Sequence, residues 1–303
     1  MVRNVIVFGS GGMLGTYLMT YFSGLNDFHI RGIGRKSYDP LHSAVDSLWD
    51  IFKKMGINQD YIIINALGFI PQAESNSEKS EDEKYIKVNS IYPQMLACIC
   101  QHYRCRLIHI STDCVFSGIS DSLTHDVLMN GYHENSPCDE TSIYGFSKRL
   151  GEPVSGYCST IRCSLIGEEI NNKRSLLEWV KQQQDKTIGG YSNQYWNGIT
   201  CLQLAESLEI IIRNESWWEG VRHLFSYEPI TKYQLISLMA EIYCIVVTIV
   251  GKPLPRQIDK QLTSLFPLNS SLNIPDIRTQ IKKLKDFDLY KKFIENDVES
   301  LLF

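Results

Sequence analysis

The segment Val5-Ile-Val-Phe8-Gly9-Ser-Gly-Gly12-Met-Leu-Gly15 decides the fold. Its first four residues are apolar and mostly β-branched, which predicts a short buried strand. Glycines follow at once, and residues 13–22 then show the apolar spacing of a helix. A strand, a glycine-rich turn and a helix in this order present backbone N–H groups and the positive end of a helix dipole to a diphosphate. The segment predicts a dinucleotide site; the alternative is a turn that serves only helix–strand packing.

Strands and helices alternate through the first half of the chain. Further strands are predicted at 29–33, 61–65, 107–111 and 159–166, and further helices at 48–55, 85–100 and 141–151. The polar, acid-rich stretch 71–84 predicts a loop and the start of a solvated helix. This alternation indicates an α/β fold, a Rossmann-type doubly wound parallel sheet with helices on both faces, over residues 1–167.

After Gly167 the pattern becomes less regular. Helices are predicted at 175–183, 202–212, 235–243 and along 276–303, and one strand at 222–225. We expect residues 168–303 to form a smaller, mainly helical substrate-binding lobe. This lobe is discontinuous, because the chain returns to the sheet near 200–226.

The composition limits the classes of function. With 303 residues, 44% hydrophobic and 21% charged, the chain is an ordinary globular protein of about two domains. A net charge of -4 argues against nucleic acid as a partner. The apolar runs are too short for a membrane span or a signal peptide. Nine cysteines without paired spacing indicate a reduced, cytoplasmic protein, and the histidines show no metal-ligand spacing.

The residues after the second predicted strand indicate the cofactor. A site for NAD commonly has an acid about 20 residues beyond the glycines, which binds the ribose 2′-hydroxyl. Here Arg35 and Lys36 occupy that place, and the first acid is Asp39. Two cations suit the 2′-phosphate of NADPH, since a guanidinium can bind it with two hydrogen bonds. NADPH is the expected cofactor, with NADH as an alternative; the other interpretation of the two cations is a solvated basic turn.

A tyrosine and a lysine are spaced as one turn of a predicted helix. Tyr144 and Lys148 share a face, and the ammonium is expected to lower the pKa of the phenol. Thr112 closes the preceding strand, at the edge where doubly wound sheets bind ligands. We therefore expect Thr112 and Tyr144 to meet at a substrate oxygen. By itself the tyrosine–lysine spacing also fits an ordinary pair on a helix surface.

Taken together, these motifs resemble the extended short-chain dehydrogenase/reductases, and most closely their dTDP-4-dehydrorhamnose reductase-like branch. The resemblance is carried by the following segments: Gly9-x-x-Gly12-x-x-Gly15, Asn65-Ala66, Ser111-Thr112-Asp113-Cys114-Val115-Phe116, Tyr144-x-x-x-Lys148-x-Leu150-Gly151-Glu152, Thr160-Ile-Arg162-Cys-Ser164 and Trp196-Asn-Gly-Ile-Thr200. It is strongest before Gly167.

The resemblance implies a role for each matching residue. Tyr144 would donate a proton, Lys148 would hold the nicotinamide ribose, and Thr112 would bind the reacting carbonyl. The cofactor would be lined by Gly9, Gly12, Met13, Leu14, Gly15, Arg35, Lys36, Asp46, Ala66, Leu67, Gly68, Ser111, Tyr144, Lys148 and Cys163. The substrate would be bound by Thr112, Asp113, Cys114, Lys173, Arg174 and Trp196.

Several of these assignments have alternatives. Lys173 and Arg174 could grip a diphosphate or form a solvated basic turn, and Trp196 could border the sugar or belong to the core. Cys114 matches a cysteine that moves protons in related epimerase-reductases, but a packing role is favoured, because no histidine lies between Arg162 and Trp196. Two departures put the particular sugar in doubt: an apparent insertion at 120–130, and Leu165 where rhamnose-forming members carry an aromatic residue.

The resulting expectation is an enzyme that uses NADPH to reduce the keto group of a nucleotide-linked 4-keto-6-deoxysugar, in deoxysugar or polysaccharide precursor synthesis. One alternative is a catalytically silent, NADP-binding regulatory subunit that resembles the β subunit of methionine adenosyltransferase. Another is a sugar-nucleotide epimerase or epimerase-reductase. The expected partner is the nucleotide-sugar substrate, without nucleic acid, membrane or metal. A homodimer is compatible with the sequence.

Overall fold

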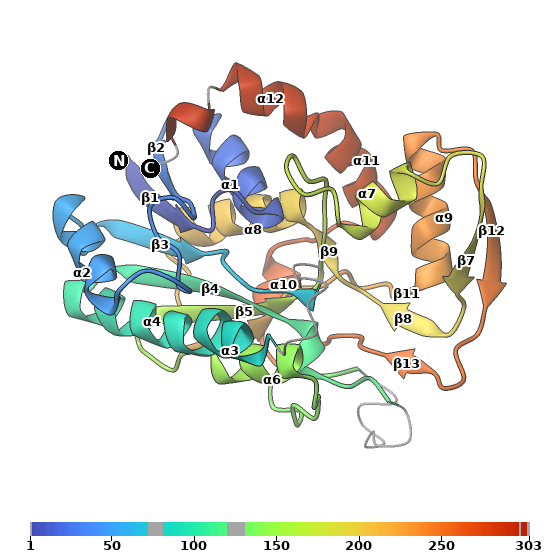
Figure 1. Ribbon diagram of the computed structural model, residues 1–303, viewed down its shortest axis with the longest axis horizontal. Helices are drawn as coiled ribbons and strands as arrows, with labels where there is room; N and C mark the ends of the chain where they lie inside the picture. The colour runs from blue at the N-terminus through green and yellow to red at the C-terminus, as the bar shows by residue number, and fades with distance from the viewer. Residues whose placement is uncertain (1, 72–80, 120–130, 297, 302–303) are drawn as a thin grey trace.

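The computed structural model describes residues 2–71, 81–119, 131–296 and 298–301. Its centre is a six-stranded, fully parallel sheet in the order β10-β5-β4-β3-β1-β2 (Figure 1). The strands are β1 (Arg3–Phe8), β2 (Phe28–Ile33), β3 (Tyr61–Asn65), β4 (Arg106–Thr112), β5 (Cys158–Cys163) and β10 (Gly220–His223). The predicted doubly wound sheet is confirmed, including the late return of the chain as β10.

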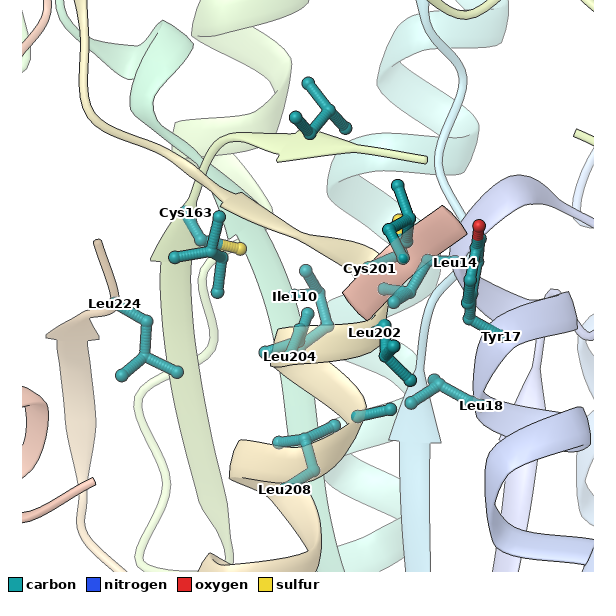
Figure 2. Packing of buried hydrophobic residues seen from close by; sticks show 14 of the residues in the cluster. Leu14, Tyr17, Leu18, Ile110, Cys163, Cys201, Leu202, Leu204, Leu208 and Leu224 are labelled. Carbon is teal, nitrogen blue, oxygen red and sulfur yellow. The ribbon is translucent and has the colours of Figure 1, made fainter. Parts of the chain in front are cut away.

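Helices cover both faces of this sheet. One face carries α1 (Met13–Ser23) and α8 (Cys201–Arg213), and the other carries α2 (Val45–Lys54), α4 (Tyr92–Tyr103) and α6 (Ile143–Leu150). Figure 2 shows the first of these layers, where leucines of α1 and α8 meet Ile110 of β4 and Cys163 of β5. Burial of each leucine contributes about 1.5–3 kcal/mol, so this layer fixes the position of the strand ends that carry the site.

The predicted helix at 85–100 is not uniform. It begins as α3 (Asp82–Tyr85), widens into a π-helical segment, η2 (Ile86–Ile91), and continues as α4. Buried Asn89 lies in the π-helical segment. π-helical turns within α-helices frequently mark functional sites.

The second half carries helices α7 (Leu176–Lys181) and α9 (Lys232–Tyr243) together with short strands that the sequence did not predict. β7 (Thr187–Tyr191) pairs with β12 (Thr248–Lys252), and β8 (Gln194–Trp196) lies between β11 (Ile230–Thr231) and β13 (Ile258–Asp259). Most are two or three residues long, or rich in glycine, so a period-two pattern has no length in which to appear. Figure 1 shows these elements grouped beyond the carboxyl ends of the large sheet.

The remaining elements return to the first lobe. The predicted strand 159–166 is two strands: β5 ends at Cys163, and β6 (Leu165–Ile166) pairs with β9 (Ile199–Thr200) instead. After the short α10 (Leu268–Ser271), α11 (Ile277–Phe287) and α12 (Leu289–Glu295) bring the chain back toward α1, followed by η5 (Val298–Leu301).

Two predictions fall on segments that the structure does not describe. The apparent insertion at 120–130 lies outside the described residues, and so does most of the loop predicted at 71–84. Within the described part of the chain, no helix has both the length and the apolar character needed to cross a membrane.

Candidate active site

The glycine-rich turn forms a cradle in which side chains have no room. Gly9 has a φ of +81°, and a Cβ there would lie 2.9 Å from the backbone of Leu67. A Cβ on Gly15 would lie 2.1 Å from the carbonyl oxygen of Gly9, so the first turn of α1 sits directly on β1. Gly12, the N-cap, gives this helix no side-chain cap. A turn of this shape with uncapped N–H groups fits the diphosphate of a dinucleotide.

The other predicted cofactor residues lie at the same edge of the sheet. Ala66 to Gly68 follow β3 beside the turn at Gly9. Arg35 and Lys36 are exposed in the turn after β2, where an anionic group can reach both. Asp46 is exposed in the first turn of α2. Leu14 is different, because its side chain is buried in the core and only its backbone faces the cradle.

Thr112 and Tyr144 are brought together by two neighbouring helical turns. Thr112 ends β4, and its hydroxyl accepts a hydrogen bond from the N–H of Cys114 at 3.1 Å, which caps the 3₁₀ turn η3 (Asp113–Val115). At Gly145 a Cβ would lie 2.2 Å from the Cys114 carbonyl oxygen, so α6 packs directly on η3. The Thr112 side chain consequently hydrogen-bonds the phenol of Tyr144.

The expected lowering of the Tyr144 pKa is wrong for this structure. Burial raises the pKa of the Tyr144 phenol, and the nearby Cys114 and Asp113 raise it further, whereas the hydrogen bond from Thr112 lowers it. Lys148 does not offset these effects, because its ammonium is directed to another partner. Tyr144 is therefore protonated at neutral pH, which suits a proton donor.

Lys148 lies between β4 and the cofactor edge. Its side chain is buried, and Nζ donates a hydrogen bond to the carbonyl oxygen of Ile110 at 2.8 Å. The same Nζ would lie 3.9 Å from a Cβ on Gly68, which places it beside the turn 66–68 that is predicted to line the cofactor. Burial lowers the pKa of Lys148 to about 8, and Glu152 and Cys163 oppose this shift. Cys163, buried at the end of β5, is thus close enough to interact with this ammonium.

Asn89 is a positioning residue that the sequence analysis missed. Its side-chain oxygen accepts from the Phe69 N–H at 2.8 Å, and its amide nitrogen donates to the Phe69 carbonyl at 2.8 Å and to Ser147 Oγ at 3.1 Å. Asn89 therefore connects Phe69, in the segment after β3, to Ser147, the residue before Lys148. The available signal was an asparagine at a core-facing position of the predicted helix, in line with Tyr85 and Tyr92.

Ser111 holds strands together rather than presenting its hydroxyl to a ligand. Its Oγ donates to Glu152 at 2.6 Å, and the same carboxylate forms a two-bond ion pair with Arg162, both at 2.7 Å. Both ion-pair partners are largely buried. This cluster joins β4, β5 and the end of α6 directly behind the site, which gives Glu152 and Arg162 a structural role.

The predicted substrate residues other than Thr112 lie in three different places. Asp113 is buried next to Thr112, and Cys114 adjoins it, with burial raising the pKa of the thiol to about 12. Trp196 is only 4% exposed and belongs to the large hydrophobic cluster that also includes residues of α1 and α8. Lys173 and Arg174 are exposed in the loop before α7.

That loop lies on the cofactor side of the molecule. The amide of Asn171 donates to the carbonyl oxygen of Gly11, in the glycine-rich turn, at 3.3 Å. Lys173 and Arg174 follow within three residues of this contact. The structure therefore places these two cations in a loop that contacts the glycine-rich turn.

The second lobe adds two lysines that no sequence pattern indicated. Lys260 follows β13 and pairs with Glu140 at 3.3 Å, while Lys232 begins α9. Attraction to both lysines opposes the effect of burial, which raises the pKa of Asp113. Both cations therefore lie near Asp113, in the turn that follows Thr112. Among the described residues, no cluster of three or more histidine, cysteine or acidic side chains could hold a metal ion.

This sheet, with its glycine cradle and its Thr112–Tyr144–Lys148 constellation, defines an extended short-chain dehydrogenase/reductase. The family model described as RmlD substrate binding domain matches residues 3–242. The chain belongs to this family.

Individual relatives are distant. A dTDP-4-keto-6-deoxy-D-glucose reductase from Streptomyces niveus is 25% identical over 77% of this chain and 76% of its own length. The Bacillus subtilis spore coat polysaccharide biosynthesis protein SpsK is 28% identical over 50% of this chain, an alignment that spans only 48% of SpsK. The Mycobacterium tuberculosis dTDP-4-dehydrorhamnose reductase is 30% identical over 50% of this chain and 44% of its own length.

Solved structures show the same fold over nearly the whole chain. The dTDP-4-dehydrorhamnose reductase of Bacillus anthracis, solved in complex with NADP, has a TM-score of 0.76 at 19% identity, covering 95% of this chain and 99% of that one. The dTDP-glucose 4,6-dehydratase of the same organism, solved with NAD, has a TM-score of 0.67 at 11% identity, covering 97% and 98%.

Proposed function

We propose that this protein reduces the keto group of a nucleotide-linked 4-keto-6-deoxysugar with NADPH. The observation that carries the proposal is the adjacency of Thr112 and Tyr144, one helical turn from a buried Lys148 whose ammonium lies beside Gly68. The names of the Streptomyces and Mycobacterium relatives supply the substrate class.

The protein residues act on the carbonyl oxygen. Tyr144 donates its proton to this oxygen as the carbon is reduced, and the Thr112 hydroxyl stabilises the negative charge that develops there. The raised pKa of Tyr144 keeps the phenol protonated until the transfer. When bound, a nicotinamide cofactor supplies the hydride that the carbon receives.

The residues present fit such a cofactor. The diphosphate would lie on the cradle formed by Gly9, Gly12 and Gly15, and Lys148 would hold the ribose next to Gly68. Arg35 and Lys36 would bind a 2′-phosphate, which favours NADPH over NADH. The NADP bound to the Bacillus anthracis structure supports this choice.

Neither alternative has a supporting observation of its own. A silent regulatory subunit would not require a buried lysine and a buried threonine at the same tyrosine. An epimerase-reductase would require a thiol that changes protonation readily, and burial raises the pKa of Cys114 to about 12.

The test is NADPH oxidation by the purified protein with 4-keto-6-deoxysugars linked to dTDP, UDP, GDP or CDP. We expect loss of NADPH absorbance with one of them, matched by an equal amount of a product two mass units heavier than the substrate. Tight NADPH binding without oxidation on any member of the panel would contradict the proposal and favour a regulatory role.

A further inference from the structure

Lys232 of the second lobe lies near the turn of the first lobe that contains Asp113 and Cys114. Lys232 is the first residue of α9, directly after its N-cap Thr231. The Thr231 hydroxyl accepts from the Gln234 N–H at 3.2 Å, and the Thr231 N–H donates to the Gln234 side chain at 2.7 Å. This reciprocal cap fixes the start of the helix, and with it the backbone from which Lys232 extends.

The Lys232 ammonium has a defined surrounding. It lies 5.6 Å from the centroid of the Trp196 ring, and Trp196 is itself buried. Burial lowers the pKa of Lys232, and attraction to Asp113 and Cys114 opposes this effect. Asp113 and Cys114 directly follow Thr112, so the ammonium lies within electrostatic reach of the turn next to the Thr112 hydroxyl.

The N–H donors of the Lys232 ammonium have no acceptor among the described residues. Within the described ranges its ammonium forms no hydrogen bond and no salt bridge with another residue, whereas Lys260 is paired with Glu140 at 3.3 Å. An ammonium carries three N–H donors, and leaving them without acceptors in a partly buried place is unfavourable. A ligand oxygen at this position would satisfy them.

Asp113 offers the complementary group. Its side chain is 4% exposed and accepts a hydrogen bond from the Thr112 hydroxyl at 3.2 Å. A carboxylate next to the ammonium disfavours a phosphate at this place, because like charges repel in a poorly solvated site. A neutral hydroxyl suits both groups, since it accepts from the lysine and donates to the carboxylate.

We propose that Lys232 and Asp113 together bind the sugar hydroxyl adjacent to the reacting carbonyl. The Asp113 carboxylate lies 3.2 Å from the Thr112 hydroxyl, so a group held by Asp113 lies next to the oxygen held by Thr112. Through Lys232, the second lobe contributes to recognition of the sugar. The substrates are then 4-ketosugars with a free hydroxyl next to the keto group. The inference rests on the proposed function.

The test pairs a substrate change with a residue change. The substrates are dTDP-4-keto-6-deoxy-D-glucose and its analogue without the ring hydroxyl next to the carbonyl. The variants are Lys232→Met, Lys232→Gln and, as a matched control on the same lobe, Lys252→Met, which removes an exposed lysine of β12. NADPH affinity, measured by fluorescence without substrate, reports whether each variant is folded.

We expect Lys232→Met to lower kcat/KM roughly 10- to 100-fold on the hydroxylated substrate, the effect of one charge-assisted hydrogen bond. The same variant should lower kcat/KM less than about twofold on the deoxy analogue, where the bond is already absent. Lys252→Met should match the wild type on both. If Lys232→Met fails to bind NADPH, Lys232→Gln decides the question.

An equal loss on both substrates would overturn the inference, since it would mean that Lys232 acts only through packing. Unchanged kcat/KM on the hydroxylated substrate would overturn it as well. A wild-type protein that binds NADPH but reduces no nucleotide sugar would instead contradict the proposed function, so the two failures are distinguishable.

Discussion

The two lobes contribute to the candidate active site in different ways. The first lobe places Thr112, Tyr144 and Lys148 on adjacent elements, each within a short sequence motif. The second lobe contributes Lys232 and Lys260, which belong to no motif and reach the site through tertiary packing. The residues proposed to carry out the reaction therefore lie in short sequence motifs. The lysines proposed to lie near the substrate come together with them only when the two lobes pack.

The largest expected effect belongs to the first lobe. Tyr144→Phe removes the proton donor without changing the size of the side chain, so kcat should fall about 100- to 10,000-fold with NADPH affinity nearly unchanged. Tyr191→Phe, on an exposed residue of β7, is the control and should keep the wild-type rate. If Tyr144→Phe keeps more than about half the wild-type rate when chemistry limits turnover, Tyr144 is not the proton donor.

The next effect concerns the choice between NADPH and NADH. Arg35→Asp replaces a phosphate-binding cation by an acid, so the preference for NADPH should fall about tenfold or more. Arg31→Asp reverses the charge of an exposed residue of β2, so it controls for the change in overall electrostatic potential. An unchanged ratio of kcat/KM for the two cofactors in Arg35→Asp would show that this arginine does not read the 2′-phosphate.

Lys148 should make cofactor binding dependent on pH. Its pKa is lowered to about 8 by burial, and an anionic cofactor binds best to the charged form. NADPH affinity should therefore be constant below this pH and weaken above it, by up to about tenfold per pH unit, because the proton must be regained on binding. Fluorescence titrations from about pH 6.5 to about pH 9.5 measure this slope.

In Lys148→Met this pH-dependent part should be absent, and the affinity should be low throughout. A wild-type affinity that stays flat across the same range would contradict the placement of the Lys148 ammonium at the cofactor.

The smallest effect is expected for the ion pair between the lobes. Lys260→Met breaks its contact with Glu140, whose carboxylate is also held by the N–H groups of Thr141 and Ser142 at 2.9 Å. The free energy of unfolding in urea should fall by about 1 kcal/mol or less. A loss several times larger would mean that this pair, rather than apolar packing, holds the lobes together.

Much of the first lobe could be predicted from the sequence. The strand β3 was predicted with its observed bounds, and the glycine turn was predicted from glycines placed between a strand and a helix. In the structure only glycine fits the φ of +81° at Gly9, against the backbone of Leu67. Such features depend on residues close in sequence, and periodicity reports them directly.

The rest depends on contacts between distant residues. Lys232 lies 119 positions from Asp113 (232 − 113), and no local pattern links them. The sequence around Asn89 predicts an ordinary α-helix rather than a π-helical segment, because the spacing of apolar residues is nearly the same in both. The pKa of Tyr144 was predicted in the wrong direction because the spacing to Lys148 is visible in the sequence but burial is not.

The central claim is that Tyr144 and Thr112 act on a carbonyl oxygen whose carbon is reduced. The most direct measurement is a reaction of the wild-type protein with dTDP-4-keto-6-deoxy-D-glucose and NADPH deuterated at its transferable position, with the product analysed by NMR. The account predicts one deuterium at the former carbonyl carbon and, in a parallel reaction in D₂O with ordinary NADPH, no solvent deuterium at any ring carbon. Solvent deuterium at a ring carbon, or no deuterium from the cofactor in the product of any 4-ketosugar nucleotide, would contradict it.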